Sequence, residues 1–312
     1  MPPLTYLEFL AAFVAGPVAV LLAVGPGIDR GRRRTAVAGV AVMLFLALSY
    51  TTPWDNYLIA VGTWTYGEGT VLFRVWNAPI EEYAFVALQT LLASLWLYRR
   101  PLPLPALPGA ASEGDADGVG ARRAGTGTDA APGGGDPAHP GPDGARADGG
   151  LDHSGTDATG IAPGVDDART DADPATGGQG IRGVLLGGGA GLAVTVAGAL
   201  ALSGPTYYLG AILAWGGPVL GLQWAVGGTY LLSVRRHVLW AVGPPVVYLC
   251  AIDRLAIGWG LWTIEPVRST GLTVAGLPVE EATFFLVTTL MVVQGLVLFH
   301  WVFETRPYRS ER

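Results

Sequence analysis

Lysine is absent from this chain of 312 residues, and all 19 basic residues are arginine. A seven-helix protein that holds retinal as a Schiff base needs a lysine amine, so this class is excluded. Cysteine is nearly absent as well, since Cys250 is the only one and it lies in an apolar stretch. Disulfides and thiolate metal sites within one chain are therefore excluded, and we expect Cys250 to serve in packing.

Charged residues are scarce, at 14% of the chain, whereas apolar residues make up 50%. This composition argues against a soluble globular domain and places the chain in a lipid bilayer. Several stretches approach or reach the roughly 20 residues that a helix needs to cross the hydrocarbon core. The predicted spans are 4–24, 35–52, 79–98, 181–203, 206–226, 234–252 and 278–301.

Arginines gather after the first, third, fifth and seventh predicted spans, at 30–34, 99–100, 235–236 and 306–312. In a seven-helix arrangement these places lie on one side of the membrane, which the positive-inside rule makes cytoplasmic. We therefore expect a multi-pass protein of the cell membrane with its N-terminus outside and its C-terminus in the cytoplasm.

Residues 101–180 differ from the rest of the chain, because they are dominated by Gly, Ala, Pro and Asp and hold 13 of the 25 acidic residues. They contain almost no large apolar side chains that could offset the entropy of ordering. We expect a disordered acidic linker on the cytoplasmic side. Its two isolated histidines, His139 and His153, are not expected to bind metal.

A short acidic motif occurs twice, and each copy opens a long apolar stretch. The copies are Pro79-Ile80-Glu81-Glu82 and Pro278-Val279-Glu280-Glu281. Upstream of them, the spacing from Asp55 to Trp64 recurs from Asp253 to Trp262. This recurrence in register indicates an internal duplication.

The duplication predicts an all-α membrane protein of seven transmembrane helices, arranged as two parallel three-helix repeats plus a connecting helix. The expected parts are a first repeat (1–100), the linker (101–180), a connecting transmembrane helix (181–203) and a second repeat (204–312). The glycine-rich run 187–191 lacks the full spacing of a dinucleotide-binding loop and lies inside a predicted span. Small residues there let helices approach closely, and no flavin or nicotinamide site is predicted.

Two adjacent carboxylates are costly at the start of a membrane helix unless they have a role. One interpretation is structural: Pro79 and Pro278 suit the first helical position, so that Glu81 and Glu280 come near the third and cap the helix or complement its dipole. The other interpretation is a general acid, because apolar burial and an adjacent carboxylate favour the protonated form.

Geometry allows both roles within one pair, since consecutive helical residues point about 100° apart. One glutamate can face the bundle interior while the other reaches an arginine such as Arg74 or Arg268. Aromatic residues accompany the acids in the predicted loops, which hold Trp54, Asp55, Tyr57, Trp64 and Trp76 in the first half and Asp253, Trp259 and Trp262 in the second. An aromatic belt at the membrane interface is one explanation. The other is that aromatic faces stabilise a carbocation formed by a buried acid.

The duplicated Pro-x-Glu-Glu helix starts and the Asp-to-Trp segments 55–64 and 253–262 resemble those of the membrane-integral lycopene cyclases. In that family two related three-helix halves occur as separate subunits or as one fused chain, and the fused haloarchaeal form is the most similar. The resemblance implies a lycopene beta-cyclase, an isomerase of carotenoid biosynthesis that needs no cofactor. It implies acid-initiated conversion of the ψ-ends of lycopene to β-rings, giving γ-carotene and then β-carotene.

We therefore expect lycopene and γ-carotene as substrates, the lipid bilayer as surroundings, and neither a metal nor a nucleic-acid partner. The expected catalytic residues are Glu81, Glu82, Glu280, Glu281, Asp55 and Asp253. Residues expected to contact the substrate or stabilise the cation are Trp64, Trp262, Trp76, Pro79 and Pro278.

Two alternatives remain open at this point. Another isoprenoid-modifying enzyme, such as a carotenoid hydratase, would form the same cation but let water capture it, so exclusion of water decides the product. A small-solute transporter can also have three-plus-one-plus-three helices, but its polar residues should lie near mid-membrane. Here Leu, Val, Ala and Phe predominate at mid-helix positions, which favours a lipid-soluble substrate.

Overall fold

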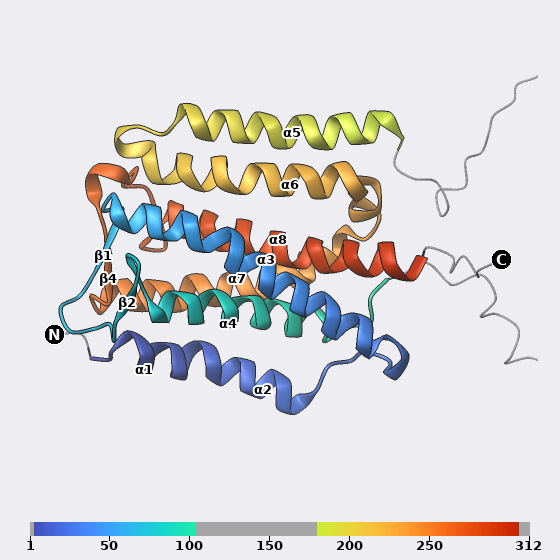
Figure 1. Cartoon of the computed structure of the whole chain (residues 1–312), viewed down its shortest axis with the longest axis horizontal. Helices are drawn as coiled ribbons and strands as arrows, with labels where there is room; N and C mark the ends of the chain where they lie inside the picture. The colour runs from blue at the N-terminus through green and yellow to red at the C-terminus, as the bar shows by residue number, and fades with distance from the viewer. Residues whose placement is uncertain (1–2, 104–179, 306–312) are drawn as a thin grey trace, which may run out of the picture. The chain divides into compact units, whose positions relative to one another are not determined.

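The computed structural model describes residues 3–103 and 180–305, which form one helical bundle (Figure 1). In these residues seven helices are long and apolar enough to cross a membrane, which confirms all seven predicted spans. The predicted linker lies outside the described residues from 104 to 179. The long helices are α2 (Gly16–Val24), which continues α1 (Tyr6–Leu10) through a π-helical turn (Ala11–Ala15), α3 (Arg33–Ala60), α4 (Ile80–Leu97), α5 (Ile181–Leu200), α6 (Tyr207–Ser233), α7 (Arg235–Gly258) and α8 (Val279–Thr305). Short 3-10 turns occupy Arg30–Arg32, Gly204–Thr206 and Pro266–Arg268.

Helices α3 and α7 run further than the apolar stretches predicted. Trp54, Asp55 and Tyr57, expected in a loop, lie in the last turns of α3, and Asp253 lies in the last turns of α7. The polar residues that end the hydropathy signal do not end the helix, and the prolines inside both helices do not break them. Membrane helices tolerate such prolines where neighbouring groups satisfy the freed backbone.

What ends α3 is a glycine in the left-handed region. Gly62 has a φ of 74°, and the N–H of Thr63 bonds back to the carbonyl of Leu58 at 2.9 Å. This is the Schellman arrangement, which satisfies carbonyls at a helix end and favours glycine. Helix α7 ends with the same pattern at Gly260, whose φ is 73°.

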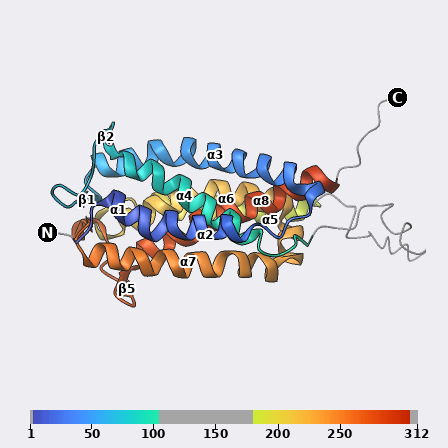
Figure 2. The same cartoon turned by 90° about the horizontal axis from the view of Figure 1, so that it is seen from below.

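Helices α4 and α8 lie at the centre of the bundle, where each contacts α3, α7 and the other (Figure 2). Helix α5 lies on the outside and packs along α6 (Figure 1). A Cβ on Gly191 of α5 would lie 2.2 Å from the Cα of Gly221 in α6, so the two backbones touch. The expectation that the glycine-rich run lets helices approach closely is confirmed.

Three small antiparallel sheets connect the helices, which corrects the all-α prediction. They pair β1 (Trp64–Tyr66) with β4 (Trp262–Ile264), β2 (Arg74–Val75) with β3 (Ala78–Pro79), and β5 (Thr273–Val274) with β6 (Leu277–Pro278). Strands of two or three residues are too short to show an alternating pattern, so sequence periodicity could not reveal them. The hairpins β2–β3 and β5–β6 lead directly into α4 and α8, and therefore set where each Glu-Glu pair begins.

Candidate active site

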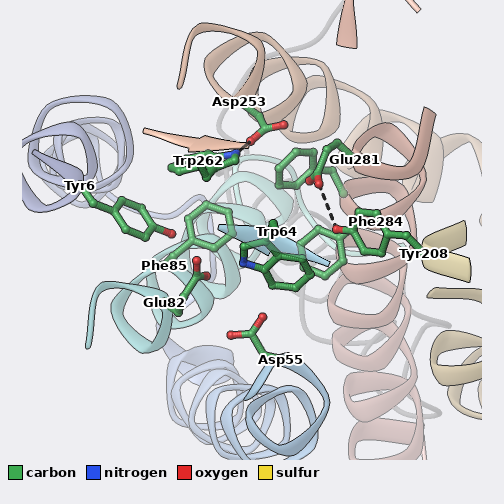
Figure 3. A pocket seen from close by; sticks show the side chains of 11 residues that line it. Tyr6, Asp55, Trp64, Glu82, Phe85, Tyr208, Asp253, Trp262, Glu281 and Phe284 are labelled. Atoms are coloured by element: carbon green, nitrogen blue, oxygen red, sulfur yellow. Dashed lines mark hydrogen bonds between the residues drawn. The ribbon is translucent and has the colours of Figure 1, made fainter. Parts of the chain in front are cut away.

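Carboxylates from four helices meet around a small cavity at the end of the bundle that carries the strands (Figure 3). Its volume is about 50 Å³. The acidic lining residues are Asp55 on α3, Glu82 on α4, Asp253 on α7 and Glu281 on α8. The aromatic lining residues are Tyr6, Trp64, Phe85, Tyr208, Trp262, Phe284 and Phe285. Acids from the first and second halves of the chain thus share one cavity.

The cavity acids have no basic partner among the described residues, and all but the partly buried Glu82 are buried. Asp55, Asp253 and Glu281 are each less than one-tenth exposed. Salt bridges in the described ranges instead join Glu304 to Arg32 and to His300, in another part of the bundle. Charge in this cavity must therefore be offset by protonation or by hydrogen bonds.

The predicted pairing of the glutamates with Arg74 or Arg268 is wrong. Arg74 donates to the carbonyl of Asn77 at 2.5 Å and lies over the ring of Tyr66. Arg268 lies over the ring of Tyr207. Arg74 is therefore held within its own connecting segment, and Arg268 contacts the start of α6, which sequence spacing could not show.

The two glutamates of each pair have different partners. Glu81 accepts the N–H of Leu72 at 2.8 Å, and Glu280 accepts both the N–H and the hydroxyl of Thr270 at 2.7 Å. Glu81 and Glu280 thus bind the segment just before each hairpin, whereas their neighbours Glu82 and Glu281 line the cavity. The angle of about 100° between consecutive helical residues produces this division.

Hydroxyl and indole groups contact the cavity acids. Tyr66 donates to Glu82 at 2.5 Å and accepts from the indole of Trp64 at 2.9 Å. Tyr208 donates to Glu281 at 3.0 Å (Figure 3). Burial, and then the charges of Glu82 and Asp55, raise the pKa of Tyr66 well above its ordinary value, so this residue stays a phenol and remains a donor.

Metal binding is not indicated by the geometry of the described residues. Within them, no three His, Cys, Asp or Glu side chains are arranged to hold a metal ion. The groups that line the cavity are suited instead to donating and accepting protons beside aromatic faces.

Comparison with known proteins identifies the family. A lycopene beta-cyclase from Halobacterium salinarum is 40% identical over 302 residues, which cover 96% of this chain and 97% of that protein. The chain belongs to the lycopene beta-cyclase family. Bifunctional lycopene cyclase/phytoene synthases from Podospora anserina and Aspergillus niger are 28% and 27% identical, over 84% and 87% of this chain and about a third of their own length. No model of a protein family matches the chain, and no solved structure matches it.

The structure brings together six of the residues that the sequence analysis expected at the site. These are Asp55, Glu82, Asp253, Glu281, Trp64 and Trp262. It places five outside the cavity lining: Glu81, Glu280, Trp76, Pro79 and Pro278. Trp76 is 73% exposed at the β2–β3 turn. Pro79 precedes α4 as its cap instead of occupying the first helical position, and Pro278 lies in β6 before α8.

Five lining residues were missed by sequence reasoning: Tyr6, Phe85, Tyr208, Phe284 and Phe285. A signal for two of them was present, because Phe85 and Phe284 each follow a cavity glutamate by three residues, and such residues share a helix face. The tyrosines had no such signal. The tripeptides Gly16-Pro17-Val18 and Gly217-Pro218-Val219 match between the two halves, but Tyr6 is ten residues before Gly16 and Tyr208 is nine before Gly217, so a strict repeat does not align the tyrosines.

The π-helical turn at Ala11–Ala15 explains this shift. A π-turn accommodates one extra residue in a helix and is frequent at functional sites. The extra residue lets Tyr6 reach the cavity, where it interacts electrostatically with Glu82, while Tyr208 reaches it from α6. Figure 3 shows both tyrosines directed into the same space.

Proposed function

We propose that this chain catalyses the cyclisation of lycopene ψ-ends to β-rings by acid–base chemistry in the cavity described above. The observation that carries the proposal is the meeting of Glu82 and Glu281 with two aspartates and a set of aromatic rings in one buried space. A protonated carboxyl there donates to the terminal double bond, the ring closes on the tertiary cation, and a carboxylate removes a proton. Because one proton enters and one leaves, the reaction is an isomerisation and needs no redox cofactor.

Aromatic faces support the cationic step. Trp64, Trp262, Phe85 and Phe284 line the cavity, and aromatic rings stabilise a cation through their quadrupoles without acting as nucleophiles. Depending on desolvation, such a contact contributes roughly 0.5–2 kcal/mol. Release of a proton to a carboxylate then competes with capture by water, and the close aromatic lining favours proton release.

A lateral apolar groove provides access for a carotenoid. The groove, of about 260 Å³, lies between α3, α4, α6 and α8, and Phe284 lines both it and the acidic cavity. Leu46 and Leu222 of its lining are exposed on the bundle surface, where they would face lipid. A long apolar substrate can therefore enter from the bilayer with its end directed toward the acids.

Buried and partly buried polar residues also occur at mid-helix positions, which corrects the sequence-based argument against a transporter. Gln89, which is buried, donates to Thr288 at 2.6 Å, and the partly buried Gln223 donates to the carbonyl of Met291 at 2.8 Å. Such hydrogen bonds between helices are a common use of polar residues in membrane proteins. The cyclase proposal rests on the cavity and the family, and not on a lack of polar mid-helix residues.

The two-repeat arrangement, 1–100 and 204–312 with 181–203 as a connecting helix, is part of the proposal. It is supported by matched hydrogen bonds: Tyr50 donates to the carbonyl of Trp215 at 2.8 Å, and Tyr248 donates to that of Phe13 at 2.6 Å. Since both halves line one cavity, we propose one composite site that acts on each substrate end in turn, with γ-carotene as the intermediate. The arginine pattern then puts the cavity near the outer face of the membrane, and the linker 101–180 and the C-terminus in the cytoplasm.

Expression in lycopene-accumulating cells, followed by separation of the pigments, tests this function. Cyclisation predicts β-carotene, with γ-carotene at early times. A hydroxylated carotenoid would instead show a hydratase. Unchanged lycopene with correctly inserted protein would refute both. A variant with Glu82→Gln and Glu281→Gln together is the matched control and should leave lycopene unchanged.

A further inference from the structure

The two cavity glutamates differ in the hydrogen bonds they accept. Glu82 accepts the hydroxyl of Tyr66 at 2.5 Å, and this hydroxyl itself accepts the indole N–H of Trp64 at 2.9 Å. Glu281 accepts the hydroxyl of Tyr208 at the longer distance of 3.0 Å. The two halves of the cavity are therefore not chemically equivalent.

A single sequence difference produces this asymmetry. Tyr66 follows Trp64 by two residues, but Ile264 follows Trp262 at the same spacing. With no tyrosine hydroxyl at that position, the indole of Trp262 donates to Asp253 at 3.1 Å (Figure 3). In one half the indole thus donates to a tyrosine, which in turn donates to a glutamate. In the other half the indole donates directly to an aspartate.

These contacts favour different charge states for the two glutamates. A distance of 2.5 Å is typical of a hydroxyl that donates to an ionised carboxylate, and the indole behind Tyr66 polarises that hydroxyl further. Glu281 accepts its hydroxyl at the longer distance of 3.0 Å and interacts electrostatically with the buried Asp253. Hydrogen bonding therefore stabilises the ionised form of Glu281 less, which favours its protonated form.

We propose that Glu281 is the acid that starts cyclisation and that Glu82 is the base that ends it, with Tyr66 as the positioning residue that keeps Glu82 ionised. The assignment rests on the proposed function. Glu281 donates its proton to C2 of the ψ-end, which leaves a cation at C1. The C5–C6 double bond attacks C1, forming the C1–C6 bond and a cation at C5. Glu82 then takes the proton from C6, and the released electron pair forms the C5–C6 double bond of the β-ring.

Each ring closure uses one proton and releases one proton inside the cavity. After one ring closure Glu82 carries a proton and Glu281 has lost one, so one proton must pass between them before the next end reacts. Asp55 interacts electrostatically with both glutamates and also lines the cavity. It is placed to carry that proton, and no external acid or oxidant is consumed.

Solvent deuterium distinguishes the acid from the base. Purified protein in liposomes made in D₂O is given lycopene, and the products and the recovered lycopene are examined by mass spectrometry. In Glu281→Gln the ψ-end is not protonated, so we expect no rings and no deuterium in recovered lycopene. In Glu82→Gln protonation and its reversal continue, so recovered lycopene gains deuterium while β-ring formation falls about a hundredfold. Rings that do form should carry their double bond at a different position, because the proton leaves from another carbon.

The reverse labelling pattern, or no label in either folded variant, overturns the assignment. Tyrosine variants provide a second test that leaves every carboxyl in place: Tyr66→Phe should slow β-ring formation about tenfold and still label recovered lycopene, and its loss should exceed that of Tyr208→Phe, whose hydrogen bond is longer. A larger loss in Tyr208→Phe than in Tyr66→Phe also contradicts the proposal. If the unmutated protein forms no rings, the result refutes the proposed function. It does not then refute the assignment of acid and base.

Discussion

The same substitution at the two adjacent glutamates at the start of α8 should lower the stability of one variant and the turnover of the other. Glu280 is fully buried and accepts two hydrogen bonds of 2.7 Å from Thr270, whereas Glu281 lines the cavity. Replacement by glutamine keeps the size of the side chain and one acceptor oxygen but removes the transferable proton. Glu280→Gln should therefore affect the folded structure, and Glu281→Gln should affect the chemistry.

The magnitudes follow from the contacts. In Glu280→Gln the carbonyl oxygen can still accept both bonds from Thr270, but the new amide group occupies the place of Oε2, which is buried without a protein partner. An unsatisfied buried donor costs about 1–3 kcal/mol, so stability falls by this amount while turnover stays within about threefold of normal. In Glu281→Gln, loss of the general acid lowers turnover roughly a hundredfold or more, with little change in stability.

Two measurements on the same purified variants separate these effects. Thermal unfolding in detergent, followed by helical circular dichroism, reports stability, and conversion of lycopene in liposomes reports turnover. Glu81→Gln and Glu82→Gln, in the first half of the bundle, provide a matched pair with the same expected contrast. A folded Glu280→Gln protein that loses a hundredfold in turnover, beside a near-normal Glu281→Gln protein, would refute the reasoning.

Further predictions concern packing, pH, the linker and cofactors. Gly191→Ala should destabilise the protein by about 1–3 kcal/mol in thermal unfolding, because its Cβ meets Gly221, whereas Gly189→Ala, with open space around it, should not. Because the pKa of Tyr66 is raised, its contribution to stability is complete below about pH 10 and is lost as pH rises further, so Tyr66→Phe should be less sensitive to alkali in the same assay. Deletion of 110–173 should leave pigment conversion largely intact, since that segment has too few apolar residues for a core. Protein freed of nucleotides should still cyclise lycopene, and a strict need for added flavin would contradict the mechanism.

Features that depend on local composition could be predicted from the sequence. The helices that cross the bilayer follow from apolar runs, because the hydrocarbon core demands about 20 apolar residues whatever the rest of the chain does. The recurrence of Pro-x-Glu-Glu with its upstream aspartate and tryptophan pointed to the acids and indoles that meet in the cavity, Asp55 and Trp64 among them. The matched motifs placed both sets of residues on one side of the membrane, but whether they build one site or two was decided only by the tertiary structure.

The direction in which each side chain points around its helix axis could not be predicted in this way. Which glutamate of each pair faces the cavity depends on where α4 and α8 begin, and strands of two residues decide this. The inward position of Tyr6 depends on one extra residue in a π-turn, which no periodicity reveals. A rotation of about 100° per residue separates a cavity side chain from one that holds a hairpin, so an uncertainty of one residue changes the role.

By itself, then, the sequence determined the membrane helices, the recurring acidic motif and the acidic and aromatic residue types that line the cavity, because all three are carried by residue type and spacing along the chain. The tertiary structure decided that Glu82 and Glu281 share the cavity while Glu81 and Glu280 bind the connecting segments. It also decided that Tyr66 donates to one glutamate and that Ile264 leaves the other without an equivalent donor. These outcomes depend on contacts between helices far apart in the chain, and side-chain direction there is set by packing and not by order in the sequence.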